Sequence, residues 1–205
     1  MKLYDTRMAP NPRRVRWVMA EKGIEDIEIV PVDLMTGGHR SPEHRARAGT
    51  SHVPVLELED GTCLSESLAI ARYLEAIRPE PNLFGHDARE QALVEMWMRR
   101  AEIYLANPIM LHTRFSHPAL AALEAPVPEV AAYNLTLAEK FMKLMDRHLA
   151  GHEFLALDRF TIADIVAFIG IDFARLVKYR PPAEHEHLKR WLDACRARPA
   201  ARAGM

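Results

Sequence analysis

Two pairs of residues in the first half of the chain have the types and spacing that peptide binding requires: Val53-Pro54 and Glu66-Ser67. Proline carries no N–H for a β ladder, so the backbone before Pro54 should be extended, unpaired and able to pair with an extended peptide. A helix is expected to begin near Glu66 and Ser67, where free N–H groups and the helix dipole favour an anion. The Glu66 carboxylate would receive an ammonium group. Together these residues suit a ligand with an amine, a carboxylate and a short peptide backbone.

A hairpin and a helix must position these residues. Residues 55–58 read as an apolar strand, and residues 62–64 read as the strand that returns. Between them, Asp60-Gly61 predicts a type I′ turn, which needs φ > 0 at both central residues. Ser65 then stands where it can cap the following helix. The simpler interpretation is that Ser65 and the two residues after it only cap this helix and bind nothing.

A Val-Pro, a hairpin and then Glu-Ser opening a helix resemble the glutathione site of the glutathione transferase family, and the resemblance covers nearly the whole chain. It implies a thioredoxin-like first domain and an all-helical second domain. It also implies that Val53 pairs its backbone with glutathione, that Glu66 and Ser67 bind the γ-glutamyl end, and that the protein is a homodimer.

Composition limits the other function classes. The chain has 205 residues, enough for two small domains, and its 27 basic and 28 acidic residues leave a formal net charge of −1. No global field would therefore recruit nucleic acid or an anionic membrane. Two cysteines do not make a disulfide framework. We see neither a signal peptide nor an apolar run of membrane-spanning length, so a cytoplasmic protein is expected.

The first part of the chain predicts an α/β domain with the order βαβαββα over residues 1–79. Residues 2–5 and 27–32 read as strands that flank a helix ending at Gly23, which makes a parallel βαβ unit. Asn11 is expected to be the N-cap of that helix, with Pro12 in its first turn. A Gly-rich loop then leads to a short helix, and the hairpin and third helix complete the domain.

The second part, residues 86–205, predicts only helices and so an all-α domain, which the resemblance makes the carrier of the electrophile site. A proline-rich linker, Arg78–Asn82, separates the two. Thr161 and Asp164 have capping-box spacing at the start of the most apolar helix, which should be the buried spine of this domain. We interpret these two residues as structural.

Activation of a thiol is the chemical problem that the resemblance poses. With a thiol pKa near 8.5, only a few per cent of glutathione is thiolate at pH 7, and lowering that pKa by roughly two units requires about 2.7 kcal/mol. Family members usually place a Tyr, Ser or Cys after the first strand. Residues 8–12 contain none of these, Tyr4 lies in the strand, and Thr6 carries the only other hydroxyl nearby.

The run Ala9–Arg16 resembles instead the yeast-type branch of the family, which lacks the usual Tyr, Ser or Cys. That resemblance implies a thiolate stabilised by the first helix's N-terminus and by a water held by the second domain. Asn11, with the N–H groups near Arg13 and Arg14, would serve at the helix. The residues expected at the second domain are Ser116 and His117, which would hold the water, and Arg114, which would attract a glutathione carboxylate. The alternative is ordinary polarity at a helix end.

Two histidines match positions where the family often places a basic or polar group for the glycine carboxylate of glutathione, His39 and His52. A metal site is not expected, because neither has a Cys or acidic partner at ligand spacing. The other histidines, His44 among them, are expected on the surface. The basic cluster of Arg13, Arg14 and Arg16 indicates a helix face, because no aromatic residues are interleaved as in a nucleic-acid patch.

The sequence therefore predicts a detoxifying transferase that conjugates glutathione, its co-substrate, to a small apolar electrophile, with no other cofactor. The alternative is a non-catalytic glutathione-binding module of the same fold. Thiol exchange is disfavoured, because Cys63 falls in a strand and Cys195 in the last helix. An isomerase or ether-cleaving activity on the same scaffold is a further alternative.

Overall fold

The structure is a computed structural model, and it describes residues 1–203. The chain divides into two compact units, Met1–Pro81 together with the segment from Pro199, and Asn82–Arg198. The sequence predicted a second domain over residues 86–205. The difference arises because the last turn packs on the first helix, where buried Arg13 Nη2 donates to the carbonyl oxygen of Ala201 at 3.3 Å.

The first unit contains four strands and three α-helices. These are β1 (Lys2–Asp5), α1 (Pro10–Glu21), β2 (Glu28–Pro31), α2 (Pro42–Ala48), β3 (Val55–Glu57), β4 (Cys63–Ser65) and α3 (Ser67–Ile77), with the short 3-10 turns η1 (Gly38–Arg40) and η5 (Pro199–Arg202).

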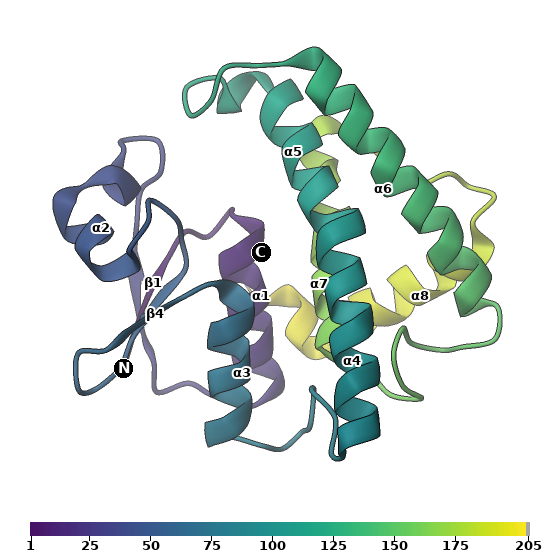
Figure 1. The fold of residues 1–205 in the computed structure, drawn as a ribbon, viewed down its shortest axis with the longest axis horizontal. Helices are drawn as coiled ribbons and strands as arrows, with labels where there is room; N and C mark the ends of the chain where they lie inside the picture. The colour runs from purple at the N-terminus through teal and green to yellow at the C-terminus, as the bar shows by residue number, and fades with distance from the viewer. Residues whose placement is uncertain (204–205) are drawn as a thin grey trace. The chain divides into compact units, whose positions relative to one another are not determined.

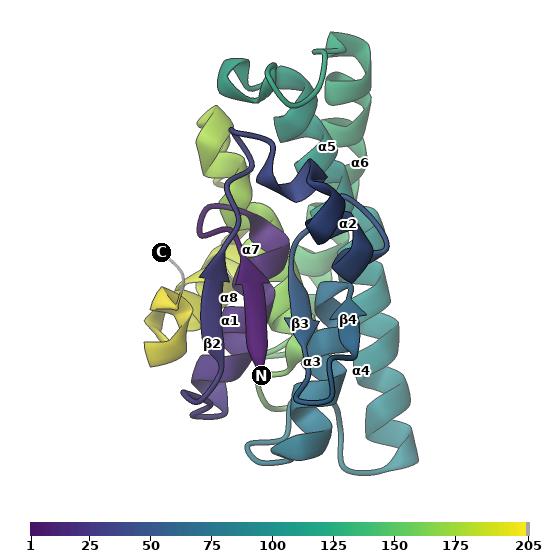
Figure 2. The ribbon, with the colours of Figure 1, turned by 90° about the vertical axis from the view of Figure 1, so that its left-hand side faces the viewer.

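The sheet of the first unit has the strand order β2-β1-β3-β4, which Figure 2 shows face on. β1 and β2 are parallel, and the β1–β3 and β3–β4 pairs are antiparallel. Helices α1 and α3 lie on one face of the sheet and α2 on the other (Figure 1). The expected βαβαββα domain of thioredoxin-like type is confirmed.

Burial on both sides of the sheet follows the alternation of strand side chains. Leu3 and Leu56 are fully buried, as are Val15 of α1 and Ile70 of α3. On the α2 side, Tyr4 and Val55 pack together in a second, smaller cluster with Ala48. These two layers fix the sheet between its helices, so that the ends of β3 and β4 are held in a defined place.

The turn between β3 and β4 differs from the predicted type I′. Only Gly61 of the Asp60-Gly61 pair has positive φ, at 83°. The Leu58 N–H donates to Thr62 O at 2.8 Å and the Gly61 N–H to Leu58 O at 3.1 Å, so three residues rather than two form the loop. Such a loop needs a left-handed residue only at its last position, which Gly61 supplies. The hairpin is confirmed and the turn type is wrong.

The second unit consists of helices. They are α4 (Ala88–Ala101), the π-helical η2 (Glu102–Ala106), α5 (Asn107–Ser116), α6 (Pro128–Leu149), α7 (Ile162–Phe173) and α8 (Glu186–Ala197), with the 3-10 turns η3 (Pro118–Leu120) and η4 (Ala174–Val177). The Asn107 N–H bonds to Glu102 O, the π spacing that accommodates Pro108, a residue without an N–H. Among the described residues, no helix has the length and apolar composition that crossing a lipid bilayer requires.

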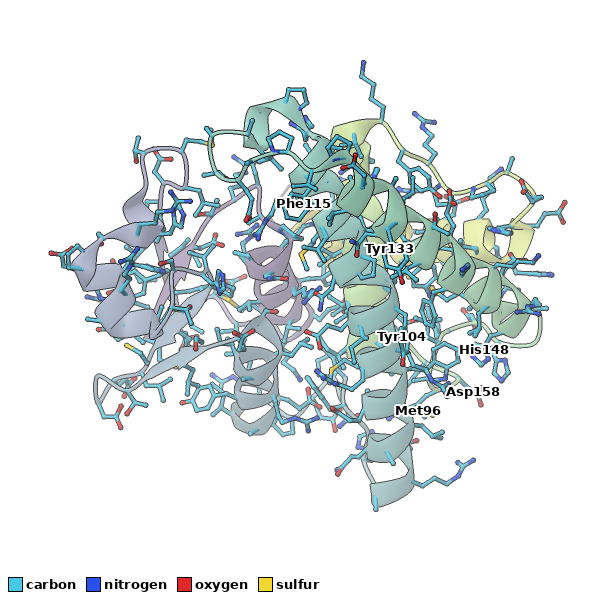
Figure 3. The ribbon with its side chains drawn as sticks, turned by 45° about the horizontal axis from the view of Figure 1, so that its top comes forward. Met96, Tyr104, Phe115, Tyr133, His148 and Asp158 are labelled. Carbon is cyan, nitrogen blue, oxygen red and sulfur yellow. The ribbon has the colours of Figure 1, made fainter. Side chains whose placement is uncertain are left out.

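Exposed apolar and aromatic side chains lie along the continuous stretch of α4 and η2 and along α6. Met96 and Tyr104 come from α4 and η2, and Tyr133 comes from α6 (Figure 3). They are 37%, 52% and 65% exposed. The Tyr104 ring also contacts the buried Phe141, with 5.8 Å between the two ring centroids, and this contact joins η2 to α6.

The spine of the second unit is α7, which is buried at every position from Ile162 to Asp172. Its predicted capping box is present, because Asp164 Oδ2 accepts from the Thr161 N–H at 2.9 Å while Thr161 accepts from the Asp164 backbone. Asp164 Oδ1 also accepts from the Leu155 N–H at 3.0 Å and from Trp191 Nε1 at 2.9 Å. This carboxylate therefore joins the start of α7 to two other segments of the unit.

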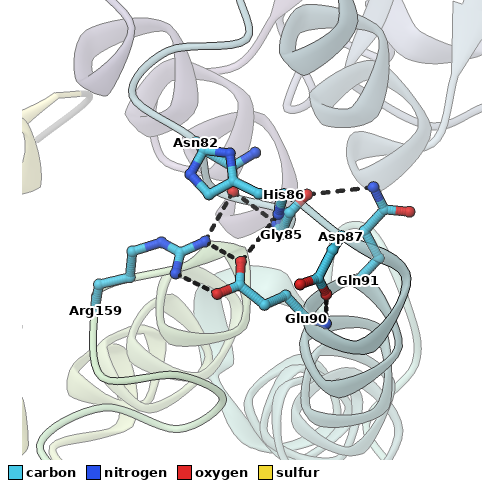
Figure 4. A network of polar contacts seen from close by, with 7 residues as sticks. All are labelled: Asn82, Gly85, His86, Asp87, Glu90, Gln91 and Arg159. Carbon is cyan, nitrogen blue, oxygen red and sulfur yellow. Dashed lines mark hydrogen bonds and ion pairs between the residues drawn. The ribbon is translucent and has the colours of Figure 1, made fainter.

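A polar network closes the start of α4 (Figure 4). Asp87 accepts from the Glu90 N–H at 2.8 Å, and Glu90 accepts from the His86 N–H at 3.0 Å. Arg159 donates to both carboxylate oxygens of Glu90, at 2.9 and 2.5 Å. This contact with Arg159 is the main reason that the pKa of Glu90 is lowered to about 2. The network holds the loop before α7 against the first turn of α4.

Candidate ligand-binding site

The β3–β4 ladder brings the two predicted pairs of binding residues to one end of the hairpin. Val55 lies opposite Ser65 in the antiparallel register. The residues before Val55, which are Val53 and Pro54, therefore lie beside the residues after Ser65, which are Glu66 and Ser67. Two segments that are far apart in the sequence thus meet where the ladder ends.

Val53 presents an unpaired backbone at this place. Within residues 1–203, neither its N–H nor its C=O has a hydrogen-bond partner, although the residue is only 9% exposed. The bond from Val53 to Pro54 is cis, and β3 begins directly afterwards. Buried backbone groups are nearly always hydrogen-bonded in native proteins, so an unpaired donor and acceptor on one residue indicate a place for a ligand's backbone.

Helix α3 begins two residues later than its predicted cap. Ser65 belongs to β4, Glu66 is the N-cap, and no side chain accepts from the first turn. Glu66 has φ 69° and ψ 116°, a backbone conformation that residues other than glycine rarely adopt and that often marks a functional site. In the described part of the chain, the N–H groups of residues 67–69 have no backbone acceptor. This helix start is therefore open, with buried Ser67 at its first position.

A buried cation lies next to this helix start. Arg14 of α1 is 2% exposed, and its Nη1 donates to Ser67 Oγ at 3.4 Å. The interpretation of the α1 arginines as a plain helix face is wrong for Arg13 and Arg14, since both are buried. The signal in the sequence was the spacing, because Arg14 stands one helical turn before the buried Val18. Arg14 adds positive charge where a carboxylate would bind.

The histidines lie in and around α2. His39 is 8% exposed, and its buried Nδ1 has no hydrogen-bond partner within residues 1–203. Burial, followed by the charge of Arg40 and the neighbouring His44 and His52, lowers the pKa of His39. At pH 7 this imidazole is neutral and offers a hydrogen bond rather than a charge. His52 is exposed, whereas His44 is only 3% exposed, so its expected place on the surface is wrong.

Asn11 does not cap α1, because the helix already begins at Pro10 and its N-cap is Ala9, which has no side-chain cap. Pro10 and Pro12 carry no N–H, and the Arg13 N–H donates to Ala9 O at 3.3 Å. In the described chain, Asn11 is thus the residue of this first turn whose N–H has no backbone acceptor. Its buried side-chain Oδ1 has no partner there either. At this helix start, the backbone N–H and the side-chain amide that are available to a ligand both belong to Asn11.

The hydroxyls near the first strand are engaged elsewhere. Tyr4 donates to Glu57 Oε2 at 2.8 Å, and this bond, with burial, raises the pKa of the phenol. Thr6 donates to the carbonyl of Val32. Neither cysteine is in a disulfide, Cys195 is fully buried, and burial raises the pKa of Cys63. None of these groups has the environment of an activated nucleophile.

Three further predicted site residues lie at the end of α5 in the second unit. Ser116 donates its hydroxyl to His112 O at 2.6 Å, and His117 Nδ1 accepts from the Ala119 N–H at 3.2 Å. Arg114 pairs with Glu124 at 3.3 Å, with both side chains about half exposed. Each of the three has a local partner, as the helix-end interpretation expects.

The chain matches two family models, "Glutathione S-transferase, N-terminal domain" over residues 9–77 and "Glutathione S-transferase, C-terminal domain" over residues 111–199. It is 34% identical to Glutathione S-transferase 2 of Saccharomyces cerevisiae, over 98% of this chain and 88% of that protein. It is 33% identical to Glutathione S-transferase 3 of Zea mays, over 98% and 90%.

Solved structures give the same result. A glutathione S-transferase domain-containing protein from Marinobacter aquaeolei superimposes with a TM-score of 0.93 at 40% identity, covering 98% of this chain and 99% of that one. Gtt2 from Saccharomyces cerevisiae does so with a TM-score of 0.93 at 33% identity, covering 100% of both chains. The sequence similarity and the structural similarity to glutathione S-transferases therefore both extend over 98% of the chain or more.

Proposed function

The chain belongs to the glutathione S-transferase family, and on this premise we propose that it conjugates the glutathione thiolate to a small apolar electrophile. The observation that carries the proposal is the meeting of an unpaired backbone at Val53 with the open start of α3 at Glu66 and Ser67. Glutathione has the matching groups, namely a short peptide backbone, an amine and two carboxylates.

In the proposed binding mode, glutathione lies along the end of the hairpin as an additional strand. Its cysteine N–H and C=O pair with the C=O and N–H of Val53. The γ-glutamyl carboxylate accepts from the N–H groups at the start of α3 and from the Ser67 hydroxyl, and the ammonium group donates to Glu66. His39 and His52 donate to the glycine carboxylate. The structural support is the exposure of Glu66 and His52 beside buried Ser67 and His39.

The proposed activation uses Asn11 in place of a hydroxyl. A helix N-terminus contributes roughly 0.3–1 kcal/mol, and up to about 2 kcal/mol when partly buried. That is less than the about 2.7 kcal/mol that a two-unit shift of the thiol pKa requires. The Asn11 N–H and its side-chain Nδ2 supply two donors from one residue. The thiolate then attacks the electrophilic carbon and forms the C–S bond, the leaving group departs with its electron pair, and the thiol proton goes to water.

A water held by Ser116 and His117 is the second part of the proposed activation. The Ser116 oxygen, having donated its proton to His112 O, still has lone pairs for a water. Because His117 Nδ1 accepts from Ala119, neutral His117 carries its proton on Nε2 and can donate there. Arg114 is proposed to attract a glutathione carboxylate, although Glu124 offsets part of its charge.

The second candidate function is a glutathione-binding module without catalysis. The observation that favours it is the engagement of Tyr4 and Thr6, which leaves the loop after β1 without an activating hydroxyl. Both candidates predict glutathione binding. They differ in the pKa of the bound thiol, which only the transferase must lower.

The test follows thiolate absorbance of bound glutathione against pH, together with thiol consumption with a panel of apolar electrophiles. We expect a bound-thiol pKa at least one unit below that in solution, and turnover with at least one electrophile. Asn11→Ala should raise the bound-thiol pKa by about half a unit or more, in line with the loss of a donor to a charged group. A thiol that binds with its solution pKa and is not consumed would support the module instead.

We also propose a homodimer in the cytoplasm. Support for the dimer is the family membership and the exposed apolar side chains Met96, Tyr104 and Tyr133, because such groups favour association. Support for the location is that neither cysteine is in a disulfide, which fits a reducing compartment. Light scattering on the purified chain should give twice the monomer mass of 23.3 kDa.

A further inference from the structure

A buried histidine of helix α2, His44, contacts the backbone carbonyl of His52, the residue before Val53. His44 is 3% exposed, and its Nε2 lies 2.7 Å from the carbonyl oxygen of His52. A carbonyl oxygen can only accept, so Nε2 carries the proton and donates. This is a short contact between a buried ring and a segment that has no strand pairing of its own.

The main chain of His44 is itself fixed. Its N–H donates to Ser41 Oγ, the N-cap of α2, at 3.1 Å, and Pro42 occupies the first helical turn. A second tie joins α2 to the same loop, because Arg45 Nε donates to Ser51 Oγ at 3.1 Å. The His44 ring therefore reaches the His52 carbonyl from a held position rather than from a mobile loop.

Because a peptide bond is planar, the hydrogen bond that holds the His52 carbonyl also fixes the direction of the Val53 N–H. The His52 C=O and the Val53 N–H belong to one planar unit, and this peptide is trans, so the two groups point in opposite directions. Fixing the carbonyl on the α2 side therefore fixes the N–H on the other side. That N–H has no hydrogen-bond partner within residues 1–203.

We propose that His44 is a positioning residue that aims the Val53 N–H at the cysteine carbonyl of glutathione. The inference rests on the proposed function, in which the Val53 N–H donates to the ligand backbone and the Val53 C=O accepts from it. His44 does not touch glutathione in this account and acts only through the His52–Val53 peptide. Without the anchor the peptide plane can rotate, and the donor is no longer held in place for the ligand.

The test compares glutathione affinity by calorimetry in wild type, His44→Leu and His44→Gln. Leucine fills the space but cannot donate, whereas the glutamine amide can replace the Nε2 donor. We expect His44→Leu to bind about threefold to tenfold more weakly, the range for one neutral hydrogen bond, and His44→Gln to stay within about twofold of wild type. His148→Leu is the matched control, because it removes a similar contact, His148 Nε2 to Leu155 O at 3.0 Å, in the second unit. Its glutathione affinity should not change.

The amide proton of Val53, observed by NMR, separates positioning from loss of stability. Its shift on adding glutathione should be present in wild type and His44→Gln and reduced in His44→Leu. If His44→Leu does not fold, His44→Asn takes its place, because its shorter amide does not reach the carbonyl. Wild-type affinity in a folded variant without the donor would overturn the inference, and so would equal weakening in the leucine and glutamine variants. A wild-type protein that does not bind glutathione would instead defeat the proposed function, and the inference with it.

Discussion

Two helices of this protein begin in opposite ways. At α7 the capping box of Thr161 and Asp164 satisfies the first turn, and the carboxylate is fully buried with donors from two more segments. At α3 the N-cap is Glu66, no side chain accepts from the first turn, and the cap residue has positive φ. Any helix start has N–H groups that lack an intrahelical partner, and it carries the positive end of the helix dipole, so the two starts differ only in what the rest of the chain offers those groups.

The difference teaches how one physical device serves two purposes. A helix start whose donors are satisfied by its own chain contributes to folding, because no buried N–H is left without a partner. A helix start whose donors remain open is a site for an anion, at some cost in stability. The start of α4, where Asp87 caps and Glu90 is held by Arg159, belongs with α7. Only α3 combines an open start with a strained cap among these three.

The largest expected effect is on stability at α7. Asp164→Ala leaves the buried donors of Leu155, Thr161 and Trp191 without an acceptor, so it should lower the free energy of unfolding by about 3–5 kcal/mol. Urea unfolding followed by circular dichroism measures this. Asp158→Ala, at an exposed aspartate of the preceding loop, is the control and should change stability by less than about 0.5 kcal/mol. A loss below about 1 kcal/mol for Asp164→Ala would break the comparison.

At α3 the expected effect is on binding instead. Glu66→Gly removes the carboxylate but relieves the positive φ, so glutathione affinity should fall about tenfold or more while stability stays the same or rises by about 1 kcal/mol. Calorimetry and urea unfolding on the same sample test both parts. Lys178→Gly is the matched control, since Lys178 also has positive φ, at 58°, and lies in the second unit. It should leave the affinity unchanged. A destabilised Glu66→Gly protein would mean that the cap contributes to folding.

A smaller effect is expected at α4, where it depends on pH. The folded pKa of Glu90 is about 2, below its ordinary value of 4.5, so its contribution to stability is present above pH 4.5 and is lost as the pH falls toward 2. Glu90→Gln should therefore lower the melting temperature at pH 6 and flatten its decline below pH 4.5. Glu153→Gln, at an exposed glutamate, should show neither change. If the melting temperature of wild type and of Glu90→Gln fell identically with pH, the ion pair between Glu90 and Arg159 would have no role in stability.

The smallest effect is expected for the thiols. If neither cysteine takes part in the chemistry, Cys63→Ala combined with Cys195→Ala should keep conjugating activity within a few-fold of wild type. Thiol consumption per folded molecule, corrected by circular dichroism, is the measurement. Complete loss of activity in a folded double variant would move the protein from conjugation toward thiol exchange.

The contrast between the two helix starts also explains what the sequence could predict. The Thr161 to Asp164 capping box is a local pattern of spacing, and the structure has it as predicted. The start of α3 was misplaced at Ser65, because Ser65 still pairs with Val55 in β4 and a glutamate does not predict the positive φ that Glu66 has. Val53-Pro54 and Glu66-Ser67 were found together because the register of a hairpin follows from a short stretch of sequence.

Residues whose surroundings come from distant segments were missed. Arg14 bonds to Ser67, 53 positions away, and nothing in its own neighbourhood announces a buried guanidinium except the helical period. His44 was expected on the surface, but its partner is a backbone carbonyl on the loop that follows α2, and the residues next to His44 in the sequence do not show that contact. Asn11 was expected at the N-cap but lies inside the first turn, because Pro10 starts the helix one residue before it.

The most direct test of the open helix start is a calorimetric titration of glutathione into wild type and into Glu66→Ala, Ser67→Ala double variants that remain folded. The account predicts measurable binding to wild type and a loss of at least about 1.5–3 kcal/mol of binding free energy in the double variant, the range for hydrogen bonds to charged groups. Wild-type affinity in the folded double variant would contradict the placement of the γ-glutamyl end at the start of α3.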